Sequence, residues 1–315
     1  MKTRNYTDMR DAFFEELYLL ALADRNVVLI YGDQAAQTYE KFRQTIPGQI
    51  INGGIAEQNL IGVAAGLALG GKKVFVHAIA PFITLRCYEQ IKVDLGLMSL
   101  PVVLAGIGAG YSYGDAGPTH HAVQDLSILR AIPKMTILNA SDTVSLSHFT
   151  KIAYENTNGP LYLRFDKANP PPIYTGEEGF CAGLAKIRKG KDVIIISTGL
   201  MVHRALDAAD KLNSLGIDAG VIDMYRIKPL NSVLLAELLT DCKKVVTLEE
   251  HGPIGGLGSL ISEFLCDSEL NSISLKRIAL EDSDCFTYGT RDYVHALMGL
   301  DTETLVARIH EWFKR

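Results

Sequence analysis

The sequence has few cysteines, and their arrangement suggests neither a disulfide framework nor a zinc site. Its five cysteines are scattered through 315 residues without CxxC spacing. An odd number of cysteines, with no signal-peptide pattern at the polar start, is typical of a reducing cytoplasm. No apolar run approaches the roughly 20 residues that a membrane-spanning helix needs. We therefore expect a cytoplasmic protein without membrane segments.

The chain also lacks an excess of positive charge. Lys and Arg number 31 against 36 Asp and Glu, for a formal net charge of -5, so the basic surface of a typical nucleic-acid-binding protein is absent. No internal repeat or low-complexity tract is present. Hydrophobic residues make up 48% and charged residues 21%. In a chain of this length, that composition predicts a globular protein with two domains.

The most apolar stretch of the chain follows Gly53 and Gly54. The segment from Gly54 to Gly70 is almost entirely small or aliphatic on every side, which predicts a helix buried all round. Glu57 is the only carboxylate in this stretch. A charge in such surroundings persists only with a partner, which makes Glu57 a candidate catalytic residue. The alternative is that Glu57 caps the helix N-terminus, where the helix dipole favours an anion.

Strands alternate with helices through the first half of the chain. Short β-branched runs indicate buried strands, and the longer periodic runs between them indicate helices. This alternation predicts a doubly wound, mostly parallel sheet in a domain that spans residues 1–166. The expected strands are residues 27–31, 49–52, 73–79, 101–105, 135–138 and 161–165. The expected helices are residues 8–24, 82–95, 122–131 and 143–155, with one more between the glycines at 54 and 70.

A second domain of the same α/β class follows a linker. Residues 167–189 contain three consecutive prolines, which continue neither a helix nor a strand, and they form the predicted linker. Residues 190–315 again alternate strands with helices, as in a second doubly wound domain. The glycine-rich turn at 252–258 resembles a nucleotide-binding loop only loosely. The Glu-Glu-His run at 249–251 before it is interpreted as a polar strand end.

A long glycine-rich loop, residues 106–121, follows the strand at 101–105 and ends in His120 and His121. Ligands of open α/β sheets gather at the carboxyl ends of the strands. The two histidines are not interpreted as zinc ligands, because no further Cys, His or carboxylate stands at a recognisable spacing. Their imidazoles are better suited to donating protons to a substrate oxygen.

Two motifs resemble the C-terminal section of transketolase, including split forms in which that section is a separate chain. They are Gly54-Ile55-Ala56-Glu57-Gln58-Asn59 with the helix behind it, and Gly117-Pro118-Thr119-His120-His121 further along. The resemblance extends over residues 9–314. It implies a thiamine-diphosphate pyrimidine-binding domain followed by a transketolase C-terminal domain. Deoxyxylulose-phosphate synthase and the β subunits of 2-oxo-acid dehydrogenases share this layout.

The resemblance implies a cofactor pocket. In that family the glutamate that matches Glu57 hydrogen-bonds N1′ of the aminopyrimidine, and the bond favours the tautomer that deprotonates the thiazolium carbon. The resemblance also implies that Phe82 stacks on the aminopyrimidine ring, and that Ile55 and Arg86 border the pocket. On residue type alone, Phe82 is interpreted as a core side chain.

Substrate-binding residues are implied as well. By the same match, His120 faces the substrate as the second catalytic residue, and His121 lies beside it. Arg164 aligns with a sugar-phosphate-binding arginine, and Arg10 is a candidate for another, because a bidentate guanidinium suits a phosphate. Without the resemblance, Arg164 at a strand end is interpreted as a solvated surface residue.

The chain departs from the family pattern at three places. The Gly-Asp-Gly…Asn motif, which binds magnesium and diphosphate, is incomplete because Gln34 follows Gly32-Asp33. We interpret Gly32-Asp33 as a strand-end turn. Ala116 replaces an aspartate that contacts the sugar donor, and Ile107-Gly108 occupies the place of a substrate-contacting histidine. Both losses remove hydrogen-bonding partners for a polyol. They argue against ordinary xylulose 5-phosphate chemistry, but not against ketol transfer as a class.

We therefore predict a transketolase-like subunit that moves a two-carbon ketol unit between sugar substrates and is active only with a partner chain. The partner is expected to carry the diphosphate-binding domain and the Mg2+ ligands, in an α2β2 heterotetramer with self-association. Two alternatives stay open. One is the β subunit of a 2-oxo-acid dehydrogenase or a pyruvate-using enzyme similar to deoxyxylulose-phosphate synthase. The other is a non-catalytic scaffold, against which the intact Glu57, Phe82 and His120 argue.

Overall fold

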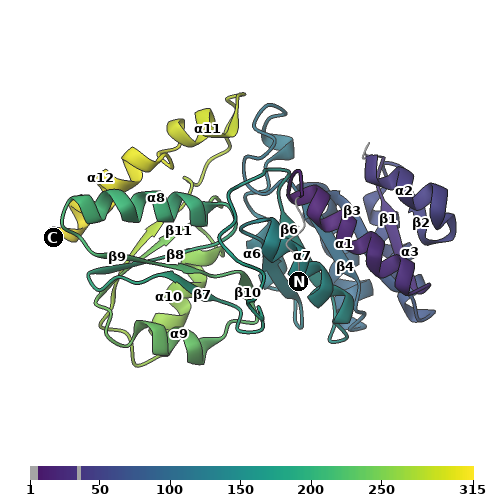
Figure 1. Ribbon diagram of the computed structural model, residues 1–315, viewed down its shortest axis with the longest axis horizontal. Helices are drawn as coiled ribbons and strands as arrows, with labels where there is room; N and C mark the ends of the chain where they lie inside the picture. The colour runs from purple at the N-terminus through teal and green to yellow at the C-terminus, as the bar shows by residue number, and fades with distance from the viewer. Residues whose placement is uncertain (1–5, 34–36) are drawn as a thin grey trace.

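The computed structural model describes residues 6–33 and 37–315, and within them the chain forms two lobes that lie side by side (Figure 1). The first lobe is built on a seven-stranded sheet and the second on a five-stranded sheet. Nearly all neighbouring strands in both sheets are parallel, with helices between them. The predicted fold class, α/β with two doubly wound and mostly parallel sheets, is confirmed.

The first sheet has the strand order β10-β5-β6-β4-β3-β1-β2. Its central strands are buried along their whole length, as expected for a parallel sheet that is covered on both faces. Its strands are β1 (Val27–Tyr31), β2 (Ile50–Asn52), β3 (Lys73–Ile79), β4 (Val103–Ile107), β5 (Thr136–Asn139), β6 (Leu161–Phe165) and the antiparallel β10 (Arg226–Lys228).

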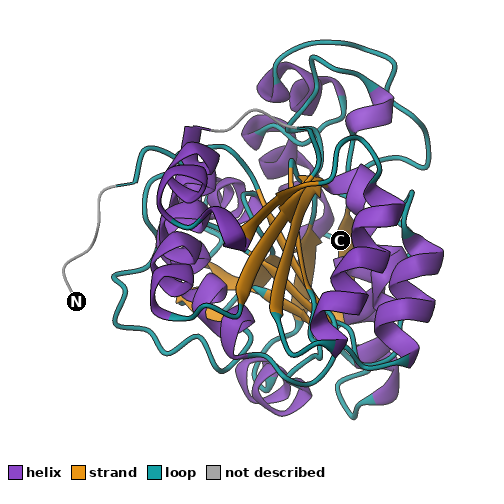
Figure 2. Ribbon diagram, turned by 90° about the vertical axis from the view of Figure 1, so that its right-hand side faces the viewer, coloured by secondary structure: helices purple, strands orange, loops and turns teal. Residues whose placement is uncertain are grey.

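Helices cover both faces of the first sheet (Figure 2). Two of them begin at an aspartate whose side chain accepts a backbone N–H, Asp8 for α1 and Asp142 for α7, which is the expected start signal for a helix. The helices are α1 (Met9–Ala23), α2 (Gln37–Thr45), α3 (Glu57–Leu69), α4 (Ala80–Thr84), α5 (Tyr88–Gln90), α6 (Asp125–Arg130) and α7 (Thr143–Glu155).

The single helix expected over residues 82–95 is instead three short pieces. α4 ends at Thr84, α5 begins at Tyr88, and a π-helical segment, Ile91–Leu97, follows it. The helical ladder is irregular here, because the Arg86 N–H reaches back five residues to the Pro81 carbonyl at 3.5 Å. Irregular helical turns of this kind are frequent at functional sites.

The second sheet has the order β12-β11-β8-β9-β7, in which only β7 is antiparallel to its neighbour. Its strands are β7 (Ala185–Arg188), β8 (Val193–Ser197), β9 (Ala219–Asp223), β11 (Lys244–Leu248) and β12 (Ser274–Ile278). Its helices are α8 (Met201–Ser214), α9 (Ser232–Leu239), α10 (Leu257–Asp267), α11 (Arg291–Leu297) and α12 (Thr302–Phe313). None of the described helices has the length and apolar character needed to cross a membrane.

The two lobes are joined by more than the connecting segment. β10 belongs to the second half of the sequence, but it pairs with β5 as the antiparallel edge strand of the first sheet. One cluster of buried apolar side chains also contains residues of both sheets, such as Leu104 and Ile196. The last residues of the predicted linker 167–189 form β7, which pairs with β9. The lobes therefore share a core.

Helix α3 is less buried than its composition suggests. One side packs on the first sheet through Leu60, Ile61 and Ala64. On another side, Val63 is 38% and Leu69 62% exposed. The expectation of burial all round therefore fails within this chain, because only one face of α3 meets the sheet. An apolar helix face that is left open is a candidate interface.

Candidate active site

The predicted site residues lie at one edge of the first sheet, where parallel strands end. Glu57 follows β2, Phe82 and Arg86 follow β3, and His120 stands on the loop after β4. These strands are parallel to one another or to β1 between them, so their carboxyl ends meet at the same edge. The fold thus collects side chains from three segments that are far apart in the sequence.

These four side chains form a continuous series of contacts. Arg86 Nη1 donates to Glu57 Oε2 at 2.6 Å. The Arg86 guanidinium also lies over the Phe82 ring, with 4.5 Å between its central carbon and the ring centroid. The Phe82 and His120 rings meet edge to face with their centroids 5.0 Å apart. An acid, a cation, an aromatic ring and an imidazole therefore share one site.

Glu57 is buried, with 5% of its surface exposed, at the first turn of α3. Its carboxylate makes no capping bond, because α3 begins after Ala56 without any side-chain cap; its hydrogen-bonding partner is Arg86. Its second oxygen faces Gly32, where an added Cβ would lie 3.9 Å away. Gly32 therefore borders the Glu57 carboxylate. Gln34, which follows the Gly32-Asp33 turn, lies outside the described residues.

His120 ends a short 3-10 turn, Pro118–His120, and is half-buried. Its Nδ1 lies 3.0 Å from the Thr119 hydroxyl, and its ring is 6.2 Å from that of Tyr113. Arg10 stands in the first turn of α1, where it pairs with Asp8 at 3.7 Å, and its side chain is 40% exposed.

His121 lies on the side of the loop that meets the second lobe. It is 3% exposed and meets the Tyr111 ring edge to face at 4.7 Å. It lines a cavity of about 180 Å³ together with Ser283 and Asp284 of the second lobe. Burial lowers the pKa of His121. The two histidines thus have different surroundings: the His120 ring meets Phe82, and the His121 ring meets Tyr111.

Arg164 is 4% exposed, so its interpretation as a solvated surface residue is wrong. Its Nε donates to Asp125 Oδ2 at 2.7 Å, and its Nη2 donates to the Ala122 carbonyl at 2.9 Å. Tyr162 donates to the same Asp125 oxygen at 2.7 Å. The structure does not bring Arg164 together with Glu57 or His120, and its bonds are those of an internal ion pair.

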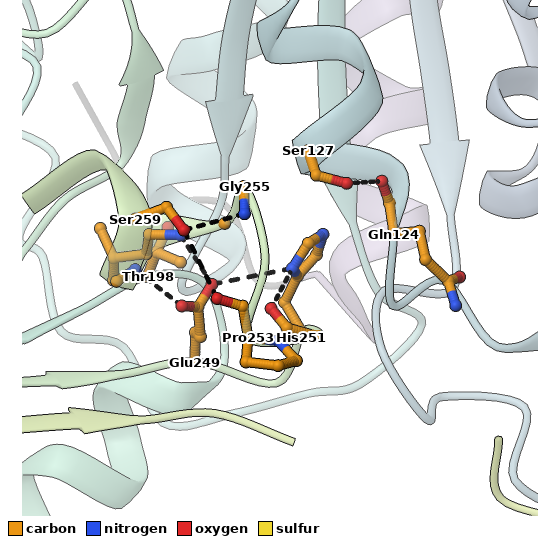
Figure 3. A network of polar contacts seen from close by, with 12 residues as sticks. Gln124, Ser127, Thr198, Glu249, His251, Pro253, Gly255 and Ser259 are labelled. Carbon is orange, nitrogen blue, oxygen red and sulfur yellow. Dashed lines mark hydrogen bonds and ion pairs between the residues drawn. The ribbon is translucent and has the colours of Figure 1, made fainter. Parts of the chain in front are cut away.

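The carboxylates and histidine after β11 are buried, which the interpretation as a polar strand end did not anticipate. Glu249 accepts backbone N–H groups of Leu257 and Gly258, both at 2.7 Å, at the start of α10 (Figure 3). Burial raises the pKa of Glu249 to about 7. Because the chain's own Glu249 occupies the N-terminus of α10, the glycine-rich turn is not free to bind a nucleotide phosphate there.

The geometry defines a two-lobe α/β protein whose first lobe presents an acid, an aromatic ring and a histidine at its strand ends. Residues 5–172 match the pyrimidine-binding domain of transketolase. Residues 183–305 match the transketolase C-terminal domain. The chain therefore belongs to the transketolase family, as the two motifs predicted.

The relatives that match nearly the whole chain include transketolase subunits and a synthase. The chain is 33% identical to an apulose-4-phosphate transketolase subunit of Phocaeicola vulgatus, over 99% of each chain. It is 34% identical to a 6-deoxy-6-sulfo-D-fructose transketolase subunit of Clostridium sp., over 98% of this chain and 95% of the relative. It is also 33% identical to 1-deoxy-D-xylulose-5-phosphate synthase of Chlorobaculum tepidum, over 97% of this chain but 48% of the relative.

Solved structures agree with this assignment. A split-gene transketolase, described as an inactive beta4 tetramer, superposes with a TM-score of 0.86 at 30% identity and covers 98% of this chain and 99% of its own. A transketolase of Pichia stipitis superposes with a TM-score of 0.84 at 18% identity, over 100% of this chain and 47% of its own. The latter likeness concerns the fold alone.

The family implies thiamine diphosphate, and the site fits one end of that cofactor. A buried carboxylate beside a half-buried aromatic face, Glu57 and Phe82, suits a flat nitrogen heterocycle. The described residues contain no group of three or more His, Cys, Asp or Glu placed to hold a metal ion.

Proposed function

We propose that this chain is the subunit of a thiamine-diphosphate-dependent transketolase that supplies the pyrimidine pocket and the catalytic acid. The enzyme transfers a two-carbon ketol unit between sugar or sugar-phosphate substrates. The observation that carries the proposal is the convergence of Glu57, Arg86, Phe82 and His120 at one edge of the first sheet.

Each of these side chains has a distinct role in the proposal. Glu57 shares a proton with the ring nitrogen of the pyrimidine, and Phe82 supports the face of that ring, which Ile55 and Arg86 border. Bound thiamine diphosphate supplies the carbon that accepts the two-carbon unit. His120, across the Phe82 ring, donates a proton to the substrate oxygen. Arg10, which is partly exposed on α1, is the candidate for the distal end of a sugar phosphate.

A separate chain supplies the diphosphate half and the Mg2+ ligands. The exposed apolar side of α3 supports this partner, because Val63 and Leu69 on α3 and Leu97 nearby are left open to solvent at 38%, 62% and 73% exposure. Ile55, next to Glu57, is 77% exposed. Covering such a surface is favourable. We propose an α2β2 heterotetramer in which this face meets another subunit, in the cytoplasm, where the five free cysteines stay reduced.

The substrate is proposed to be a ketose other than the commonest one. Ala116 brings no hydrogen-bonding group to the loop before His120. At Gly108 the backbone φ of 92° and the Tyr113 ring, 2.2 Å from where a Cβ would stand, leave no room for a side chain. Relatives named for apulose 4-phosphate and for a sulfofructose are consistent with an unusual sugar.

Co-expression with a chain that carries the diphosphate-binding motif tests the proposal. We expect the purified complex to bind thiamine diphosphate only in the presence of Mg2+, as measured by isothermal titration calorimetry, and to transfer a two-carbon unit from a ketose donor. The isolated chain is the control and is expected to bind at least about 100-fold more weakly, a loss of roughly 2.7 kcal/mol of binding free energy. Equally tight binding by the isolated chain would show that the half-site account is wrong.

A pyruvate-using synthase is the second candidate function. The identity to 1-deoxy-D-xylulose-5-phosphate synthase over 97% of this chain favours it. The two functions differ in whether CO2 is released, because transfer from pyruvate breaks a carbon–carboxylate bond and transfer from a ketose does not. Release of labelled CO2 from carboxyl-labelled pyruvate by the complex, without turnover of ketoses, would replace the first proposal with the second.

Arg86 occupies the space in which a ring stacked on Phe82 would lie. Its guanidinium covers that ring and pairs with Glu57, so binding of a pyrimidine displaces it. The Arg86 side chain is 43% exposed. Ion pairs that are exposed in this way contribute about 1 kcal/mol or less to stability. We therefore expect Arg86→Ala to tighten thiamine diphosphate binding by the complex, up to about fivefold, in the same titration. Weaker binding would instead identify Arg86 as a direct ligand.

A further inference from the structure

The loop that carries His120 is closed at its base and held there by the second lobe. Gly110 and Ala122 exchange two backbone hydrogen bonds, at 3.1 and 3.0 Å, and so join the two ends of the loop. Directly beside this bridge, the Tyr111 N–H donates to Glu250 Oε1 at 2.9 Å. Glu250 follows β11, so a carboxylate of the second lobe binds the backbone of the catalytic loop.

Side chains of α11 bind the Glu250 carboxylate. Its carboxylate accepts from Arg291 Nε at 3.1 Å and from His295 Nε2 at 2.6 Å, and a second bond runs from Arg291 Nη2. Arg291 also pairs with Asp166 at the end of β6, at 3.1 Å. Burial by itself would raise the pKa of Glu250, but Arg291 and His295 outweigh burial, and the net effect is a lowered pKa. The carboxylate is therefore ionised at neutral pH.

The fit between Glu250 and the loop is also steric. Gly110 has a φ of 57°, and a Cβ there would lie 2.3 Å from the Glu250 carboxyl carbon. Further along the loop, the Gly289 N–H donates to the Gly114 carbonyl at 3.1 Å. The Tyr288 ring lies against Gly117, 2.7 Å from where a Cβ would stand. Second-lobe groups thus contact the loop at its base, its middle and the start of the His120 turn.

We propose that Glu250 is a positioning residue that fixes the geometry of His120 through the loop backbone, which makes the second lobe part of the catalytic apparatus. Glu250 touches neither Glu57 nor the Phe82 face, so its effect reaches the reaction through loop position. The proposal rests on the proposed function, because His120 is catalytic only if ketol transfer takes place here. The structural part, that Glu250 orders the loop, stands independently of the reaction.

Glu250→Gln keeps the shape of the side chain and removes its charge, which weakens the bonds from Arg291, His295 and the Tyr111 N–H. Asp292→Asn is the matched control: Asp292 is the next residue on α11, pairs with Arg204, and its side chain is 84% exposed. We expect hydrogen–deuterium exchange of the full-length chain, followed by mass spectrometry, to rise in peptides covering 110–121 in Glu250→Gln and to stay unchanged in Asp292→Asn.

In the complex with the partner chain, the same pair of variants tests catalysis. Misplacement of a catalytic group by about 1 Å costs on the order of 100-fold in rate, so we expect the turnover number of Glu250→Gln to fall by about 10- to 100-fold. Affinity for thiamine diphosphate should stay within about twofold of wild type, since the cofactor contacts are elsewhere. If Glu250 contributed only to stability, the Glu250→Gln complexes that still assemble would have a normal turnover number.

Unchanged exchange in the loop, or normal turnover with increased exchange, would overturn the proposal. If Glu250→Gln does not fold, Tyr288→Leu replaces it, because Tyr288 is 62% exposed and yet lies against Gly117. Raised exchange at 114–120 with reduced turnover in that variant supports positioning by the second lobe, and no change in either opposes it. If wild-type complex shows no ketol transfer at all, the proposed function fails while the exchange result still decides the ordering of the loop.

Discussion

Glu57→Gln is expected to lower the turnover number of the assembled enzyme by about 1,000-fold, the usual scale for loss of a positioned acid–base group. The amide fills the same volume and can still donate a hydrogen bond to a ring nitrogen. It cannot pass a proton back and forth. Binding of thiamine diphosphate should therefore survive within about fivefold while turnover does not, which is the signature of an interaction made in the transition state.

The fold should tolerate this change. The ion pair with Arg86 is lost, but the Arg86 side chain is 43% exposed, so water can solvate the guanidinium and the cost in stability is about 1 kcal/mol or less. Glu89→Gln is a suitable control, because Glu89 is exposed on α5. Steady-state rates of the two variants in complex with the partner, beside calorimetric titrations, make the comparison. Turnover of Glu57→Gln within tenfold of wild type would remove Glu57 from the mechanism.

Arg164→Met is expected to lower the free energy of unfolding by about 3–5 kcal/mol, the range for removing one partner of a buried ion pair. Asp125 has no exposed surface, and its carboxylate receives bonds from Arg164 and Tyr162. Methionine fills most of the space but leaves that charge with one hydroxyl. The neighbouring His251, 4.0 Å from Asp125, is itself buried and has a lowered pKa, chiefly because of burial. It is a poor substitute for the guanidinium.

Urea unfolding of the full-length chain measures this loss, with Arg188→Met as the control. Arg188 pairs with Asp210, whose side chain is 73% exposed, so its replacement should cost about 1 kcal/mol or less. The double variant Arg164→Met with Asp125→Leu should recover part of the loss, because no uncompensated charge remains. The opposite outcome is an Arg164→Met chain that remains stable and whose complex has a raised KM for phosphorylated substrates only. That result would identify Arg164 as a phosphate ligand.

Much of the fold follows from local sequence because its signals are local. The buried strand at Val27–Tyr31 is a continuous apolar run, and the one at Leu161–Phe165 is apolar except for Arg164. α7 follows its N-cap Asp142 with a capping box and spans the predicted residues 143–155. Such patterns depend on neighbours within a few residues. Glu57 and His120 are candidates for a different reason, since each stands in a short motif that resembles a transketolase motif.

The tertiary structure decided what depends on distant partners. The residues around Arg164 do not indicate that it will be buried and paired with Asp125. Glu250 and Tyr111 meet although they are 139 residues apart, and no periodicity encodes that contact. For α3, the composition predicts burial on every side, but nothing within the described residues covers the side that carries Val63 and Leu69. Local sequence determined most of the strands and helices, and the motifs that resemble transketolase supplied the catalytic candidates. Burial, charge pairing and the support of the His120 loop were decided by packing, because the free energy of a buried charge depends on which groups the fold brings beside it.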